Sequence, residues 1–253
     1  MCPTSGSLAT QSMAQLNANH PGLGALGSRP KLVLGTASTA RRRVLAGLLA
    51  DHGLAVALQT AAADIDERAV GARLRSIGDA SALVTALAAA KADALVARLG
   101  PQDALLVTAD QVVVSGGDIR EKPGTPAQAV AWLTSYGTLP PSTVSGVAVT
   151  CLTTGERAVG VDVATVHFRP LSDSEAEGLV EGGGGAALGC AGALMVEGPA
   201  AAYITHVDGS LDSVFGLPVG LLLDLAAECA IKADGARADG GIVGEGARAC
   251  GAP

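Results

Sequence analysis

The stretch "LGTASTARRRVL", residues 34–45, joins a short apolar run to a segment with helical spacing. The run Lys31–Gly35 predicts a buried strand, and Arg41–His52, followed by Gly53, predicts a helix. Three consecutive arginines open this helix, although the chain has only 17 Lys and Arg in 253 residues. Cations there face the positive end of the helix dipole at a cost of about 0.3–1 kcal/mol, which a bound anion would reverse. The turn is therefore either a phosphate-binding site or a solvated basic helix start.

The alternation of strand and helix patterns continues along the chain. Further strands are expected at 55–60, 105–109, 143–152 and 157–169, and a hairpin at 111–121. Further helices are expected at 79–99, from Pro126 to about Tyr136, from the capping box at Ser172–Glu175 to the glycine run 182–185, and from Pro218 to about Ile231. A change of apolar parity predicts a bulge near Ala164. The pattern predicts an α/β fold with a mixed sheet.

The two ends of the chain lack such patterns. Residues 1–29 are rich in Ser, Ala, Asn and Gly, and predict a disordered leader, with a transit peptide as the alternative. Residues 232–253 are rich in Gly and Ala, and predict a disordered tail. We therefore expect one folded domain at residues 30–231.

Composition narrows the class of protein. The hydrophobic fraction of 49% is enough for one sizeable core or two lobes packed together. The net charge of −7 offers no general attraction for nucleic acid or an anionic membrane, and no run of about 18 uninterrupted apolar residues occurs. Five scattered cysteines without a C-x-x-C pair indicate neither a disulfide framework nor a zinc site. We expect a cytoplasmic protein, unless the leader directs it to an organelle.

Two acidic motifs could bind a metal. In "ADIDERAV", Asp64, Asp66 and Glu67 form an acidic loop that could hold Mg²⁺ together with phosphate oxygens, or could simply be solvated. In "LLVTADQVVV", Asp110 ends an apolar strand and Gln111 follows it. A carboxylate at the carboxyl edge of a sheet could orient and deprotonate water or bind a metal, or it could cap a turn.

Two lysines could add charge for a phosphate ligand. Pro123 holds Lys122 extended in "REKPGTP", and Lys91 lies on the long helix. Each could contact a triphosphate or could be an ordinary surface residue. The sequence contains neither G-x-G-x-x-G after the first strand nor G-x-x-x-x-G-K-[ST], which argues against a dinucleotide-binding oxidoreductase and a P-loop NTPase.

Taken together and in order, these stretches resemble the Maf family of nucleoside triphosphate pyrophosphatases. The resemblance runs over residues 31–228 and rests on six motifs and a closing helix: "LGTASTARRRVL", "ADIDE", "ALAAAKADAL", "TADQVV", "REKP", "GCAGALMVEG" and "GLPVGLLLDL". It implies an elongated mixed sheet flanked by helices, with two lobes around a central cleft, as in Maf/ITPase-like folds. A homodimer is one arrangement that the resemblance allows.

The resemblance also implies chemistry. Members cleave the α–β phosphate bond with Mg²⁺ or Mn²⁺, giving a nucleoside monophosphate and pyrophosphate. Asp110 resembles the family's proton acceptor, and Glu67 with Asp110 resembles its metal-facing carboxylates. The implied phosphate contacts are Ser38, Arg41, Arg42, Lys91 and Lys122.

The base preference follows from the same resemblance. The pairs Asp110-Gln111 and Glu197-Gly198 are similar to the branch that acts on 7-methyl-GTP, so Arg41, Gln111 and Glu197 form the expected specificity set. The positively charged 7-methylguanine carries N–H donors that the carboxylate of Glu197 could accept. The alternatives are a dTTP, UTP or CTP pyrophosphatase of the same family, or a non-catalytic nucleotide-binding regulator of cell division.

Overall fold

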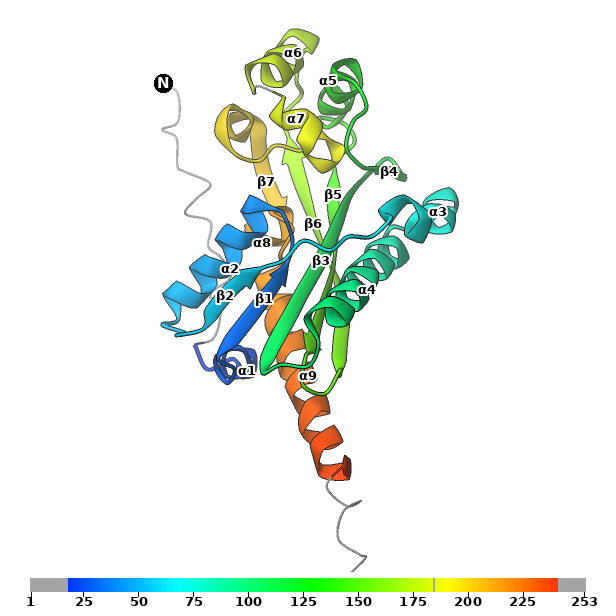
Figure 1. The fold of residues 1–253 in the computed structure, drawn as a ribbon. Helices are drawn as coiled ribbons and strands as arrows, with labels where there is room; N and C mark the ends of the chain where they lie inside the picture. The colour runs from blue at the N-terminus through cyan, green and yellow to red at the C-terminus, as the bar shows by residue number, and fades with distance from the viewer. Residues whose placement is uncertain (1–17, 184, 241–253) are drawn as a thin grey trace, which may run out of the picture.

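A seven-stranded mixed sheet organises the fold, which a computed structural model describes for residues 18–183 and 185–240 (Figure 1). Its strands are β1 (Lys31–Gly35), β2 (Ala57–Thr60), β3 (Ala104–Ser115), β4 (Asp118–Arg120), β5 (Ser142–Cys151), β6 (Arg157–Phe168) and β7 (Ile204–Asp208). The strand order is β2-β1-β3-β5-β6-β7, and β4 pairs with the end of β3. Strand β1 is parallel to β2 and β3, whereas β3, β5, β6 and β7 pair antiparallel. The predicted mixed sheet is thus confirmed.

Helices cover both faces of this sheet. They are α1 (Pro21–Gly27), α2 (Thr39–Asp51), α3 (Glu67–Ile77), α4 (Ala80–Leu99), α5 (Pro126–Ser135), α6 (Asp173–Gly182), α7 (Ala186–Gly189), α8 (Leu211–Val214) and α9 (Val219–Gly240), with 3₁₀ turns η2 (Ala191–Ala193) and η3 (Gly198–Tyr203). Helices α1, α2 and α9 pack on one face, and α4 packs on the other. Helices α5, α6 and α7 gather at the far end of the long strands (Figure 1).

In addition to two smaller clusters beneath α4, the long strands β3, β5 and β6 carry a large apolar core toward each end. One surrounds Leu32, Leu45 and Leu222, where α2 and α9 meet the sheet. The other surrounds Tyr136 and Phe168, where α5 and α6 meet the opposite end. The molecule is therefore elongated with two lobes, as the resemblance implied (Figure 1).

Helix α4 lies close to the sheet because two small features of the strands allow it. A Cβ atom on Gly146 would lie 2.5 Å from the carbonyl carbon of Val84, so only glycine fits beneath the helix. The buried hydroxyl of Thr108 donates to the carbonyl of Ala88 at 2.7 Å. By length and composition α4 could cross a membrane, a criterion that the core helices of folded proteins also meet. Here its leucines and alanines pack on β3 and β5.

Both ends of the described chain differ from the prediction. Helix α1 lies within residues expected to form a disordered leader, because Leu23 and Leu26 are buried against α9 and Gly22 lets the backbone approach Leu223. Helix α9 continues beyond Ile231 to Gly240. Residues 1–17 of the predicted leader and 241–253 of the predicted tail lie outside the described residues.

The expected bulge is also elsewhere. Strands β5 and β6 pair without a shift through Ala164, and the irregularity lies between His167 and Phe168, where β6 pairs with β7. The change of apolar parity in the sequence is real, but its cause is different. Val166 and Phe168 turn into the second core, while Val159 and Val163 stay exposed on the sheet.

Candidate active site

The site begins where β1 stops. Gly35, the last residue of β1, pairs with Thr108, and β4 does not begin to pair with β3 until Val113. Between these points one edge of β3 has no neighbouring strand in the described sheet, and Asp110 and Gln111 face a cavity there. The prediction that Asp110 ends its strand is wrong, because β3 continues to Ser115. It is the neighbouring strand that ends.

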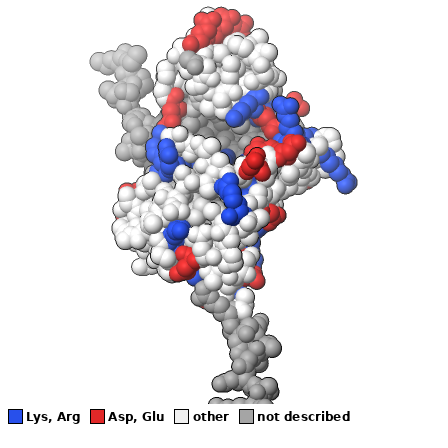
Figure 2. All heavy atoms as spheres, in the orientation of Figure 1, with Lys and Arg blue, Asp and Glu red and all other residues white. Residues whose placement is uncertain are grey.

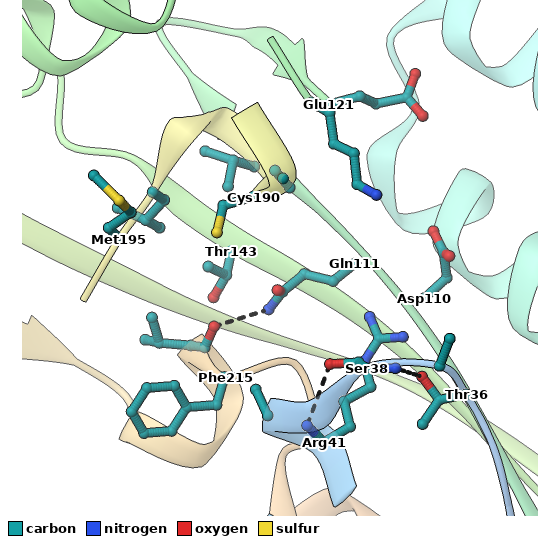
Figure 3. A pocket seen from close by; sticks show the side chains of 18 of the residues that line it. Thr36, Ser38, Arg41, Asp110, Gln111, Glu121, Thr143, Cys190, Met195 and Phe215 are labelled. Atoms are coloured by element: carbon teal, nitrogen blue, oxygen red, sulfur yellow. Dashed lines mark hydrogen bonds between the residues drawn. The ribbon is translucent and has the colours of Figure 1, made fainter. Parts of the chain in front are cut away.

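The cavity has a volume of about 920 Å³ and lies between the two lobes, where Figure 2 shows a hollow bordered by basic and acidic side chains. Its lining divides into a charged end and an apolar end (Figure 3). The charged end is lined by Arg41, Glu67, Arg68, Arg75, Lys91, Asp110, Glu121 and Lys122. The other end is lined mainly by Ala186, Cys190, Leu194, Met195, Val196, Val214 and Phe215. Such a cavity suits a ligand with an anionic and a largely apolar part.

Lys91 joins two carboxylates at the charged end. Its ammonium nitrogen lies 2.5 Å from Oδ1 of Asp110 and 2.9 Å from Oε1 of Glu67. Asp110 is only 8% exposed, and burial raises the pKa of its carboxyl above the ordinary value, although Lys91 and Arg41 act in the opposite direction. A carboxylate that is buried in this way is a stronger base than an exposed one.

The basic turn separates its arginines. Ser38 caps α2 by accepting the N–H of Arg41 at 3.3 Å, and its own N–H donates to Oγ1 of Thr36 at 3.0 Å (Figure 3). The guanidinium of Arg41 donates to the carbonyls of Gly216 at 2.9 Å and Ala109 at 2.8 Å. Burial lowers the pKa of Arg41, against the opposing effect of nearby Asp110 and Glu67. Two of its five N–H groups are used, which leaves others for a ligand.

Arg42 does not share this position. Its side chain is exposed and is absent from the cavity lining as the described chain forms it. The structure thus places Arg42 outside the lining of the cavity, about 100° around α2 from Arg41, and its predicted phosphate contact stays a prediction. Ser38, Arg41, Lys91 and Lys122, the other predicted phosphate contacts, all line it.

Helix α3 adds residues that the sequence did not single out. Asp66, expected in an acidic loop, instead caps α3 by accepting the N–H groups of Arg68 and Ala69 at 3.0 Å. Glu67 is the first residue of α3, and Arg68 and Arg75 of the same helix line the cavity. Arg68 lies within the quoted stretch "ADIDERAV" but has no predicted role there, and Arg75 lies in no motif, because only the fold brings α3 beside the cavity.

Arg75 ties α3 to the segment after β4. Its guanidinium contacts both oxygens of Glu121 at 2.7 and 2.9 Å and donates to the carbonyl of Glu67 at 3.0 Å. This contact lowers the pKa of Glu121 below its ordinary value. Lys122, next in the chain, lines the cavity and pairs with none of the residues that the structure describes, which leaves its ammonium available.

Gln111 has a fixed orientation. Its amide nitrogen donates to the carbonyl of Ser213 at 2.8 Å and to Oγ of Ser145 at 3.0 Å. It also lies 3.4 Å from the carbonyl oxygen of Val214, the contact drawn in Figure 3. Reversing the amide would place its oxygen against the carbonyl of Ser213, so the oxygen remains turned away from these groups. Gly216 has a φ of +89° and lies against both Gln111 and Arg41. A Cβ atom at this position would lie 3.2 Å from Oε1 of Gln111 and 3.0 Å from Nε of Arg41, so the absence of a side chain leaves room for both groups.

Glu197 lines the cavity, but in the structure its carboxylate is paired. Oε1 of Glu197 lies 2.5 Å from a guanidinium nitrogen of Arg43, and both side chains are more than half exposed. The guanidinium carbon of Arg43 lies 5.2 Å from the centre of the Phe215 ring. Glu197 and Phe215 line the cavity, whereas Arg43 is not part of the described lining.

The carboxylates fit a magnesium-type site only in part. Glu67 and Asp110 converge on one point, since both contact the same nitrogen of Lys91. The described residues contain no group of three His, Cys, Asp or Glu that could hold a metal ion. Mg²⁺ needs only one or two carboxylates when phosphates and water complete its shell, so the donor set fits a metal that binds with its substrate. Asp64 lies outside the cavity lining.

Comparison with known proteins agrees with this geometry. A family model described as Maf-like protein matches residues 31–229. The chain belongs to the Maf family. It is 34% identical to a 7-methyl-GTP pyrophosphatase of Dictyostelium discoideum, over 79% of this chain and 98% of that protein. It is 35% identical to a nucleoside triphosphate pyrophosphatase of Synechococcus elongatus, over 78% of this chain and 92% of that protein. It is 34% identical to a dTTP/UTP pyrophosphatase of Cupriavidus metallidurans, over 74% of this chain and 91% of that protein.

Proposed function

We propose that this Maf-family chain hydrolyses the α–β phosphoanhydride bond of a nucleoside triphosphate, releasing a nucleoside monophosphate and pyrophosphate. The observation that carries the proposal is the convergence of Arg41, Lys91, Asp110 and Lys122 on one cavity, although four separate segments supply them. Guanidinium and ammonium groups bind a triphosphate, and the buried carboxylate supplies a base beside it. The apolar end of the cavity accommodates the nucleoside.

In this proposal Asp110 orients a water molecule toward the α-phosphorus and accepts its proton. The water oxygen forms a bond to phosphorus, and the bond from phosphorus to the bridging oxygen breaks. The electron pair leaves on pyrophosphate, whose charge is balanced by Arg41, Lys91 and Lys122. Positioning and fixed charges supply most of the acceleration in reactions of this type.

We further propose that Glu67 and Asp110 hold Mg²⁺ or Mn²⁺ together with the phosphates. When bound, the metal would neutralise phosphate charge and polarise the P–O bonds. Lys91, which now bridges the two carboxylates, then turns its ammonium toward the phosphates. Its long flexible side chain allows this change, and an ammonium has three donors to share.

We propose 7-methyl-GTP as the preferred substrate. The names of the relatives do not decide between bases, because a protein named for 7-methyl-GTP and one named for dTTP/UTP are each 34% identical to this chain over the matched residues. The residues favour the former. Glu197 offers a carboxylate to a cationic base, and Gln111 presents an amide oxygen that can accept an N–H group.

The test is a panel of nucleoside triphosphates with Mg²⁺ or Mn²⁺, in which pyrophosphate and orthophosphate are measured separately. We expect pyrophosphate from 7-methyl-GTP, and a loss of at least 100-fold in kcat for Asp110→Asn with an unchanged circular dichroism spectrum. Faster release from dTTP, UTP or CTP would assign the chain to the other substrates of the family. Nucleotide recovered intact after incubation with Mn²⁺ would instead indicate a binding protein that regulates without turnover.

A further inference from the structure

Arg43 holds the two cavity residues best suited to a cationic base. Its guanidinium contacts the carboxylate of Glu197 at 2.5 Å and lies over the ring of Phe215 at 5.2 Å. The ion pair joins residues 154 positions apart, from α2 in one lobe and from the loop before η3 in the other. It therefore joins the two lobes at a position beside the cavity.

The chemistry of this contact resembles the chemistry of the expected base. A guanidinium is a planar, delocalised cation with N–H donors, and it stacks on aromatic rings. An N7-methylated guanine is also a planar, delocalised cation with N–H donors. A carboxylate and an aromatic ring that hold the first group can hold the second by the same forces.

The contact with Arg43 is weak enough to be exchanged. The side chains of Arg43 and Glu197 are 56% and 57% exposed, and an exposed ion pair shifts an equilibrium by at most about fivefold. Arg43 can also turn further into solvent, because its side chain is already more than half exposed and lies outside the cavity lining formed by the described residues. Glu197 and Phe215 remain in the lining after Arg43 leaves.

We propose that Arg43 is a resident competitor of the substrate base. In the free protein it occupies Glu197 and Phe215, and the base must displace it to reach them. The identity of residue 43 then sets the affinity for any base that binds there. The inference rests on the proposed function only in that the base of a nucleotide reaches Glu197.

The experiment measures binding of 7-methyl-GMP and GMP by isothermal titration calorimetry, since these products do not turn over. Arg43→Gln removes the competitor and should tighten binding of 7-methyl-GMP about fivefold. This sign distinguishes the proposal from a general electrostatic effect. Loss of a positive charge near an anionic ligand would otherwise weaken binding.

A matched control removes the same charge from the same helical turn. Arg42→Gln should leave the affinity unchanged or slightly lower, because Arg42 is exposed and contacts neither Glu197 nor Phe215. In a Glu197→Gln background, the gain from Arg43→Gln should largely disappear, because the ion pair that it releases is already absent. Phe215→Leu should lower the preference for 7-methyl-GMP over GMP, since the cation loses its aromatic partner.

The outcomes are separable from those of the proposed function. If Arg43→Gln leaves the affinity unchanged or weakens it while wild type still releases pyrophosphate, the competitor role is wrong and the proposed activity stands. If the gain from Arg43→Gln persists in full in the Glu197→Gln background, the competitor role is also wrong. If no nucleotide yields pyrophosphate but Arg43→Gln still tightens binding, the activity is wrong and the competitor role stands.

Discussion

The ammonium of Lys91 on α4 lies 2.5 Å from Oδ1 of Asp110 on β3. The same nitrogen contacts Glu67 on α3, so a single cation neutralises two carboxylates from two other elements. A hydrogen bond from Thr108 fixes the position of α4, which carries Lys91, relative to β3, which carries Asp110. Thr108 lies two residues before Asp110 on β3, and it binds the carbonyl of Ala88, about one helical turn before Lys91.

Replacing Lys91 with Met should destabilise the fold by about 3–5 kcal/mol, because the variant leaves the carboxylate of Asp110 buried without its cation. The apolar part of the side chain is retained, so packing changes little. Chemical denaturation of the wild type and of Lys91→Met measures the free energy of unfolding. The loss should be smaller when Asp110 is already Asn, since no buried charge then lacks a partner. Equal losses in both backgrounds would show that Lys91 and Asp110 are not coupled.

Adjacent arginines should differ sharply in their effect on activity. Arg41→Lys removes the fork that holds the carbonyls of Ala109 and Gly216, and should lower kcat/KM for the nucleotide at least tenfold. Arg42→Gln should change kcat/KM by less than twofold, because this side chain is exposed outside the lining. Steady-state kinetics on the two purified variants tests the difference. A larger effect at position 42 would mean that the cavity changes shape when substrate binds.

Much of the site could be predicted because its residues lie in short local motifs. Apolar periodicity placed β1, α2 and α4 to within two residues, and the motifs marked Asp110, Lys91, Lys122 and Glu67. The sequence could not show which of the adjacent arginines of α2 faces the cavity. That depends on the rotation of α2 about its axis, which packing of Val44, Leu45 and Leu48 against the sheet determines.

Other features were missed because their cause lies far away in the chain. Helix α1 carries three glycines in seven residues, which makes it a poor helix by itself, and its burial against α9 stabilises it. The pairing of Arg43 with Glu197 depends on two lobes that meet only in the folded protein. Local propensity contains no information about either contact.

Gly146→Ala should destabilise the protein by about 1–3 kcal/mol, because the added methyl group would lie 2.5 Å from backbone atoms of Val84. Helix α4 would move away from β5 and carry Lys91 with it, so activity should fall as well. Gly178→Ala is the matched control: it lies within α6, has nothing within 4 Å of the added methyl group, and should gain about 0.5–1 kcal/mol. Thermal unfolding of both variants gives the comparison, and equal shifts would contradict the packing argument.

Glu175 makes a pH-dependent contribution to stability that can be isolated. Its carboxylate accepts the backbone N–H and the hydroxyl of Ser172 at 2.8 and 2.9 Å, and pairs with Arg169 at 3.0 Å. The backbone hydrogen bond from Ser172 is the main cause that lowers the pKa of Glu175 to about 2. Because the folded-state pKa is depressed, the charged group stabilises the fold above its unfolded pKa of about 4.3. This contribution is lost as the pH falls toward 2.

Glu175→Gln keeps an acceptor for the capping box but removes the charge that titrates. The melting temperature of the wild type should therefore exceed that of the variant at pH 6, and the difference should shrink as the pH falls from about 4.5 to about 2. Glu177→Gln serves as the control, since Glu177 is exposed on the same helix and is not part of the capping box. Scanning calorimetry at several pH values measures the difference. A gap that stays constant across this range would show that the capping interaction does not depend on the charge of Glu175.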